Sequence, residues 1–166
     1  HPDDETIWMG GTILTHPHID WTVLALTRVS DGDRAPRFRR AMKTLRAQGI
    51  ITDADDEGRL DLRASTKEMK RILAKKFSRA HFDYIFTHAA SGEYGHLKHR
   101  AAHQAVCRTL QTPKLFTFAY EMDKSDQYAV PRKKSALTLK LSAGIFNKKR
   151  NLLHIIYGFA RDSFEY

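Results

Sequence analysis

The chain has 166 residues, of which 42% are hydrophobic and 28% are charged. This length and balance predict one domain over residues 1–166 and exclude a disordered chain. Lysine and arginine total 28 against 19 aspartate and glutamate residues, so the formal net charge is +9. No apolar run approaches the roughly 20 residues of a membrane-spanning helix, and no secretory signal pattern opens the chain. We therefore expect a cytoplasmic protein.

The cysteine content limits the metal chemistry that is open to this chain. Cys107 is the one cysteine of the sequence. An internal disulfide framework and a cysteine-rich zinc site are both excluded by this count. A bound metal therefore requires histidine, aspartate or glutamate ligands.

Predicted strands and helices alternate along the chain. Short β-branched and aromatic runs predict strands, and apolar residues at helical spacing predict helices. The predicted strands are residues 21–27, 82–87 and 114–118. The predicted helices are residues 5–14, 37–48, 65–80, 99–110 and 148–158. Gly49 is interpreted as a helix stop, and Ser65 with Glu68 as a capping box. The acidic stretch 52–61 is predicted to be a loop.

This alternation predicts the fold class. Strands separated by helices of this length indicate crossover connections and a mostly parallel sheet. The expected fold is α/β, a Rossmann-like three-layer sandwich. Because the chain begins at His1 and not at methionine, we expect its first strand to be missing from this sequence. In such folds, ligands bind in the loops that follow the carboxyl ends of strands.

Two polar clusters occupy predicted loops of this kind. The sequence HPDDE, residues 1–5, precedes the first predicted helix, and GEYGHLKH, residues 92–99, follows the second predicted strand. Each has an ordinary structural explanation, because paired aspartates often cap helices and a His-x-x-His pair is frequently a surface pattern. Those explanations do not account for complementary ligands at two strand-to-helix turns. Together the clusters favour a metal site.

The spacing within the clusters fits three metal ligands. His1 and Asp4 lie three residues apart at a helix entrance, where their side chains can converge. His96, His99 and His103 would lie on one helical face if the helix covers all three. Two imidazoles and one carboxylate form a zinc site that keeps a position open for water. An aspartate beside such ligands, as Asp3 is here, is a candidate general base.

These motifs resemble those of the zinc-dependent N-acetylglucosaminyl deacetylases, the PIG-L or LmbE-like family. The resemblance extends from His1 to about His103. The family works on N-acetylglucosaminyl-phosphatidylinositol, on mycothiol and bacillithiol precursors and on related amides. The resemblance implies three zinc ligands and one general base. The implied ligands are His1, Asp4 and His99, and the implied base is Asp3.

The resemblance also implies residues that act on the substrate. Tyr94 matches a catalytic tyrosine that binds substrate and polarises its carbonyl. His96 matches a catalytic histidine that stabilises the oxyanion or protonates the leaving amine, and Arg37 matches an arginine of the substrate pocket. Two positions depart from the family pattern, because Lys98 and Arg40 stand where the family has acidic residues. A cation at Lys98 is expected to lower the pKa of a nearby imidazolium.

The resulting hypothesis is a zinc-dependent hydrolase of an N-acetylglucosamine-type substrate that releases acetate and a free amine. Iron, cobalt or manganese ions also suit such ligands. One alternative is a zinc amidase that acts on a different small N-acyl substrate. A second is a catalytically degenerate, basic binding module on the same scaffold. A third takes His1 as a mature N-terminus whose amine and ring chelate copper.

The charge distribution bears on the partner of this protein. Basic residues concentrate between Arg132 and Arg150. Such a segment is either a solvated basic face or a site for an anionic substrate or membrane surface. No stacked aromatic motif of the RNA-binding kind accompanies it, so no nucleic acid is expected. The expected partner is a small amino-sugar conjugate.

Overall fold

A computed structural model describes residues 1–110, 112, 114–124 and 129–163. The chain folds as two compact units. The first unit contains residues 1–53 and 137–166, and the second contains residues 54–136. Helices and strands alternate along much of the chain, so the predicted α/β class is confirmed.

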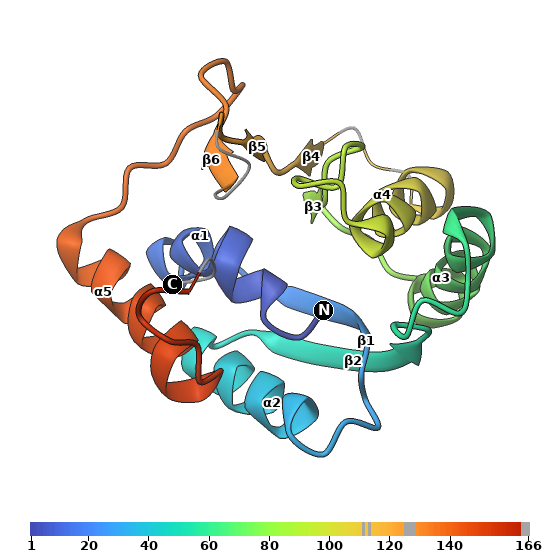
Figure 1. Ribbon diagram of the computed structural model, residues 1–166, viewed down its shortest axis with the longest axis horizontal. Helices are drawn as coiled ribbons and strands as arrows, with labels where there is room; N and C mark the ends of the chain where they lie inside the picture. Colours follow the sequence, from blue (N-terminus) through green and yellow to red (C-terminus); the bar gives the residue numbers. More distant parts are fainter. Residues whose placement is uncertain (111, 113, 125–128, 164–166) are drawn as a thin grey trace. The chain divides into compact units, whose positions relative to one another are not determined.

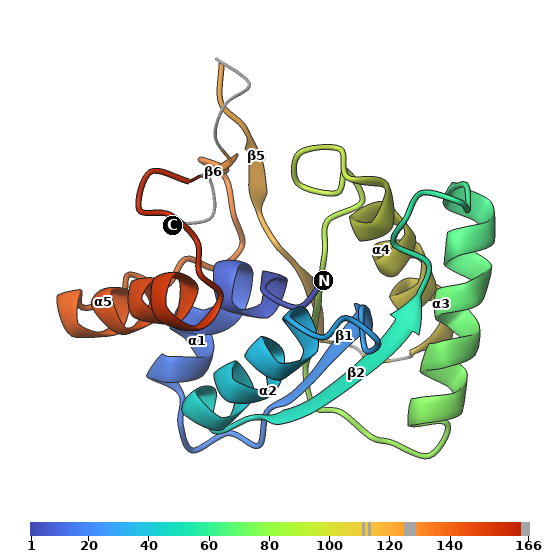
Figure 2. The same cartoon turned by 60° about the horizontal axis from the view of Figure 1, so that its bottom comes forward.

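The first unit combines a two-stranded sheet with helices from both ends of the chain (Figures 1 and 2). Its strands are β1 (Thr22–Thr27) and β2 (Gln48–Ala54). Its helices are the π-helical η1 (Glu5–Met9), α1 (Gly10–Thr15), α2 (Arg34–Leu45), α5 (Ala143–Asn151) and the π-helical η2 (Leu152–Ile156). Buried side chains from three of these helices, Ile13, Phe38 and Leu153, form much of its core.

Gly49 belongs to β2, so its predicted role as a helix stop is wrong. Helix α2 ends earlier because Arg46 adopts a left-handed conformation with φ of 56°. The backbone N–H of Ala47 then bonds to the carbonyl of Met42 at 3.0 Å. A Cβ added at Gly49 would lie 2.5 Å from the Met42 side chain, so glycine allows strand and helix to approach closely.

The second unit contains two helices that pack against each other, α3 (Leu62–Phe77) and α4 (Leu97–Thr109). Strand β3 (Ile85–Thr87) pairs in parallel with β4 (Leu115–Thr117), as the prediction of parallel strands requires. Strands β5 (Tyr120–Met122) and β6 (Ala129–Pro131) form a separate antiparallel pair. The core between the helices includes the buried residues Met69, Leu73, Ala101 and Ala105.

The predicted capping box of α3 is wrong. Asp61 caps this helix instead, because its carboxylate accepts the backbone N–H of Ala64 at 2.7 Å. Ser65 lies within the helix and is fully buried. The loop predicted at 52–61 is also partly wrong, since β2 continues to Ala54 with Thr52 buried.

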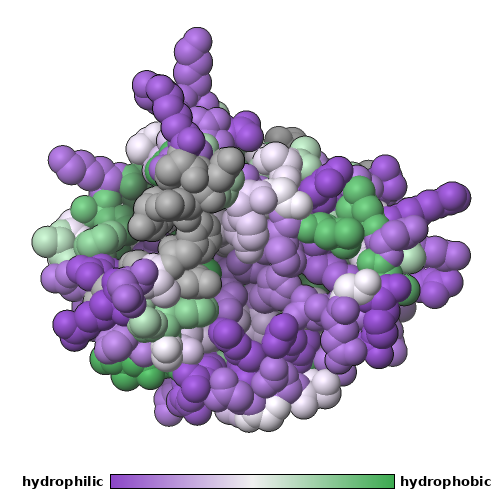
Figure 3. All heavy atoms as spheres, viewed as in Figure 1, coloured by the Kyte–Doolittle hydropathy of each residue, from purple (hydrophilic) through white to green (hydrophobic). Residues whose placement is uncertain are grey.

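The segment around α5 exposes apolar side chains among basic ones. Leu137, Phe146 and Ile155 are all exposed, as are Lys140 and Lys148. Figure 3 shows hydrophobic atoms among hydrophilic ones over this segment. Ser142 caps α5, which therefore begins five residues before the predicted start at 148. Within the described part of the chain, no helix has the length and apolar character needed to cross a membrane.

Candidate functional site

Both carboxylate oxygens of Asp4, at the start of η1, have hydrogen-bond partners. One oxygen lies 3.1 Å from Nδ1 of His1, and the other accepts the Trp8 indole N–H at 2.9 Å. The side chain of Asp4 is buried. The local chain thus brings the imidazole of His1 and the carboxylate of Asp4 together, with Trp8 restricting the carboxylate.

Asp3 has the properties of a carboxyl group that exchanges a proton near neutral pH. Burial and the neighbouring charge of Asp4 raise the pKa of Asp3 to about 7, although Arg34 opposes this rise. Arg34 donates to the Asp3 carboxylate at 2.8 Å. The backbone of Asp3 has φ of 137°, a region that side chains rarely adopt. The first loop therefore holds a strained, largely buried carboxyl group beside Asp4.

Glu5 connects this loop to the far end of the same unit. One carboxylate oxygen accepts the Tyr157 hydroxyl at 2.6 Å and the Thr6 hydroxyl at 2.7 Å. The other oxygen accepts the backbone N–H of Asp3 at 3.0 Å. Burial raises the pKa of both Glu5 and Tyr157. A tyrosine 152 positions away thus helps to support the HPDDE loop.

Arg37 and Arg34 occupy different surroundings. The guanidinium of Arg37 donates to Asp33 at 2.7 Å and to the carbonyl of Ile156 at 3.1 Å. A Cβ at Gly158 would lie 2.5 Å from that guanidinium. Arg37 therefore bonds to the C-terminal segment, while Arg34 contacts Asp3. Substrate binding by Arg37 stays a prediction.

In the second unit, one carboxylate contacts two histidines. Glu93 Oε2 lies 2.8 Å from Nδ1 of His99 and 2.9 Å from Nδ1 of His88. The two imidazole rings stack with their centroids 3.8 Å apart. Although burial alone would raise it, hydrogen bonds from His88 and His99 lower the pKa of Glu93 to about 2. Glu93 is therefore a buried carboxylate that stays ionised.

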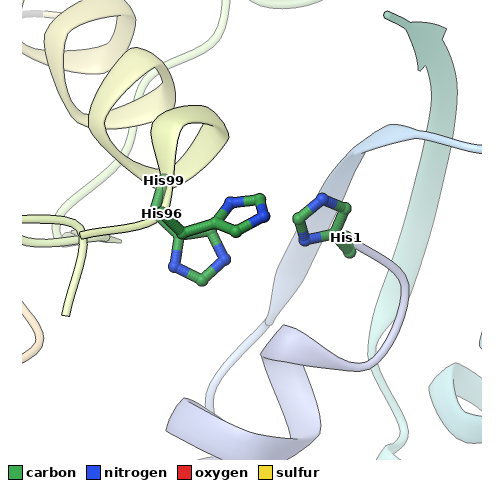
Figure 4. Close-up of side chains that lie close together, drawn as sticks. All are labelled: His1, His96 and His99. Carbon is green, nitrogen blue, oxygen red and sulfur yellow. The ribbon is translucent and has the colours of Figure 1, made fainter. Parts of the chain in front are cut away.

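Tyr94 and His96 lie beside the same imidazole. The ring centroids of His96 and His99 are 4.6 Å apart, and those of Tyr94 and His99 are 5.3 Å apart. Figure 4 shows the rings of His96 and His99 near the start of α4, and it also draws His1 in the loop before η1. His96 precedes α4 in an extended conformation, so the helix does not cover all three histidines and its face includes His99 and His103 but not His96.

Lys98 has a buried anionic partner. Its ammonium group donates to Asp55 at 2.8 Å and to Ser65 at 3.0 Å, and 6% of the side chain is exposed. Hydrogen bonds from Lys98 and Arg59 hold the pKa of Asp55 well below its usual range. The lysine charge is thus balanced by the carboxylate of Asp55, in the loop between β2 and α3, which sequence reasoning did not anticipate.

Several of these residues were not assigned roles from the sequence. The contacts of Glu93 could have been found from the local sequence. Glu93 follows His88 by five positions and precedes His99 by six. Arg34 and Tyr157 had no comparable signal, since their partners Asp3 and Glu5 are distant in sequence.

Both units contain residues with the chemistry of metal ligands. The candidate ligands are His1 and Asp4 in the first unit and His88, His96 and His99 in the second. Imidazole nitrogen and carboxylate oxygen are donors that zinc and several other divalent transition metals accept. In His99, contact of Nδ1 with Glu93 is the carboxylate–histidine arrangement typical of metal-binding histidines. The donor chemistry therefore fits a divalent metal.

The family model of GlcNAc-PI de-N-acetylase, PIG-L, matches residues 1–110. The matched region includes the HPDDE loop and the GEYGHLKH loop together with all the candidate ligands. Tyr157 and α5 lie beyond it. No significant match is found among curated proteins or among solved structures.

Proposed function

Because the chain belongs to the GlcNAc-PI de-N-acetylase (PIG-L) family, we propose that it is a zinc-dependent hydrolase of N-acetylglucosamine-type substrates. The family activity is deacetylation, a hydrolysis that releases acetate and a free amine. The observation that carries the proposal is the match over residues 1–110, which covers every candidate ligand. The metal, the substrate and the site residues belong to the proposal.

We propose that His1, Asp4 and His99 bind the metal. Two separate observations support this assignment, one for His1 and Asp4 and one for His99. His1 and Asp4 are neighbours whose carboxylate is restrained by Trp8, and His99 is restrained by Glu93. A zinc ion bound by such residues lowers the pKa of water towards ~7 and polarises a carbonyl oxygen.

The remaining site residues handle protons and charge. Asp3, with a pKa of about 7, accepts a proton from the attacking water as that water adds to the acetamide carbon. Tyr94 and His96 donate hydrogen bonds to the carbonyl oxygen as negative charge develops there. Cleavage of the C–N bond then transfers a proton to the amine, from Asp3 or from His96. One amide and one water become acetate and an amine.

We propose that the substrate carries an anionic group besides its N-acetyl sugar. The formal net charge of +9 and the basic residues between Arg132 and Arg150 support this choice. Turnover of anionic and neutral N-acetylglucosaminides at matched ionic strength tests it. Faster turnover of the anionic substrate is expected, and equal turnover contradicts the proposal. Vesicle binding without such a preference would indicate that the segment contacts a lipid surface.

The buried position of Lys98 bears on the alternative of a degenerate binding module. Its ammonium group pairs with Asp55, so the departure from the family pattern at this position has a structural explanation. Loss of activity is not needed to account for it. The catalytic proposal is therefore preferred.

The test combines metal content with acetate release. Purified protein is expected to contain a stoichiometric divalent metal and to release acetate from GlcNAc-PI. Chelation should abolish release, and added zinc should restore it. His99→Ala should lose both metal and activity, whereas the exposed His18→Ala is the matched control. Metal without acetate release across an amide panel would contradict the enzymatic proposal, and absence of metal would contradict the site.

A further inference from the structure

The carboxylate of Glu93 accepts hydrogen bonds from three donors. Oε2 accepts from Nδ1 of His99 at 2.8 Å and from Nδ1 of His88 at 2.9 Å. Oε1 accepts the backbone N–H of Ala89 at 2.7 Å. The side chain of Glu93 is completely buried. Its position is therefore determined by these partners and by the loop around it.

The loop reaches this position through unusual backbone conformations. Gly92 and Glu93 both have positive φ, 72° and 56°. A Cβ at Gly92 would lie 2.7 Å from the carbonyl oxygen of His96, so only glycine allows so close a turn. A glutamate in this region is strained relative to glycine. The fold therefore tolerates strain where the carboxylate turns back towards the two histidines.

The contacts determine which ring nitrogen of each histidine carries a proton next to Glu93. An ionised carboxylate only accepts hydrogen bonds, so each Nδ1 that contacts Glu93 must carry a proton. A neutral imidazole has one N–H, and its lone pair is then on Nε2. The rings of His88 and His99 stack with an interplanar angle of 17°, so both are constrained together. His103 further anchors this arrangement by contacting the carbonyl of His88 at 2.9 Å.

We propose that Glu93 is a positioning residue that holds His88 and His99 as Nδ1–H tautomers and thereby presents Nε2 of His99 as the metal ligand. The tautomer assignment comes from the geometry of the second unit alone. The ligand assignment rests on the proposed function. Carboxylate partners of this kind orient metal-binding imidazoles and increase their basicity.

Nitrogen-detected NMR of the histidine rings tests the tautomer assignment in metal-free protein. Both His88 and His99 are expected to show a protonated Nδ1, the nitrogen that contacts Glu93. Glu93→Gln should disturb this pattern. The amide has only one oxygen that accepts hydrogen bonds, and its NH2 group cannot accept from the donors that contact the other carboxylate oxygen. An unprotonated Nδ1 in either wild-type ring would overturn the assignment.

A cobalt titration tests the effect on the metal. Glu93→Gln is expected to weaken cobalt binding about 10- to 100-fold. Glu68→Gln is the matched control, because Glu68 accepts the backbone N–H of Asp55 at 3.0 Å in the same unit. Unchanged cobalt affinity in folded Glu93→Gln would overturn the positioning role.

A folding control and a second variant distinguish loss of the positioning contact from loss of the fold. Circular dichroism establishes whether Glu93→Gln is folded. If it is not, Glu93→Asp replaces it. This variant keeps the charge with a shorter reach, so it should still bind cobalt more weakly than the wild type, and an unchanged affinity would overturn the positioning role. Wild-type protein that binds no metal would overturn the proposed function, while the NMR result would still decide the tautomer assignment.

Discussion

The HPDDE loop and the GEYGHLKH loop both bury a carboxyl group, but the two groups have opposite electrostatic surroundings. Asp3 lies beside Asp4, and its pKa rises to about 7. Glu93 receives hydrogen bonds from two imidazoles and a backbone N–H, and its pKa falls to about 2. Burial favours the neutral form of both groups, so their partners decide the difference. One carboxyl group is suited to exchange a proton, and the other is suited to hold neighbouring residues in place.

The two loops also differ in the sequence range of their support. His88, Glu93 and His99 lie within twelve consecutive residues. The first loop depends in addition on Tyr157, which bonds to Glu5 from the other end of the unit. Substitutions can therefore test the electrostatic difference and the structural difference separately.

The largest expected effect is on catalysis by the first loop. Asp3→Asn removes the proposed proton acceptor and should lower the turnover rate by about 10²- to 10⁴-fold. Metal content should remain, because Asp4 and His1 are unchanged. Acetate release and elemental analysis measure the two effects. Asp53→Asn is the control, since Asp53 is an exposed aspartate of the same unit that bonds to Ser30. Undiminished turnover in Asp3→Asn would remove Asp3 from the mechanism.

A smaller effect, on stability, is expected in the second unit. Lys98→Met leaves the buried carboxylate of Asp55 without its ammonium partner and should lower the Tm by several degrees. Lys67→Met is the control, because Lys67 is exposed on α3.

The pH dependence of this stability difference follows from Asp55. Its native pKa is depressed by Lys98, so its contribution is fully present above the unfolded-state pKa of about 3.9 and is lost progressively as the pH falls from there towards the lower native pKa. The Tm difference between wild type and Lys98→Met should therefore be greatest near neutral pH and should shrink in acid. Thermal unfolding between neutral pH and pH 3 measures it. A difference that does not depend on pH would point to packing rather than charge.

The smallest expected effect concerns the long-range support of the first loop. Tyr157→Phe removes the hydroxyl that donates to Glu5 at 2.6 Å. The free energy of unfolding should fall by about 1–3 kcal/mol, the cost of leaving a buried acceptor without its donor. Urea unfolding measures this change, with Tyr84→Phe as the control on a half-exposed tyrosine. Equal stability of the two variants would show that the Tyr157–Glu5 bond contributes little.

The sequence was informative wherever the signal was local. The strands near 22–27 and 85–87 and the polar loops around Asp4 and His99 follow from short runs of residues. Strand β2 was missed because its end falls in an acidic stretch that resembles a loop, although Thr52 is buried. The ends of helices depended on caps that compete within a few residues, as Asp61 does with Ser65.

Long-range partners were the part that local patterns did not reveal. No spacing rule connects Tyr157 with Glu5 or Arg34 with Asp3, because tertiary packing creates those contacts. The charge at position 98 was interpreted through its neighbours in sequence, whereas its partner is Asp55, 43 positions earlier. The motif indicated which residues gather in each loop, and the fold determined what supports them.

The buried pair of Lys98 and Asp55 makes the substitutions at these two positions interdependent. The family pattern has an acidic residue at position 98, but Lys98→Asp alone would place two carboxyl groups together where water is largely excluded. Their mutual repulsion and burial would force one of them to take up a proton or would push α4 away from the loop that holds Asp55. Restoring the family residue therefore also requires a neutral or basic residue at position 55. An engineer who returns this loop to the family sequence has to change a residue of the neighbouring segment in the same step.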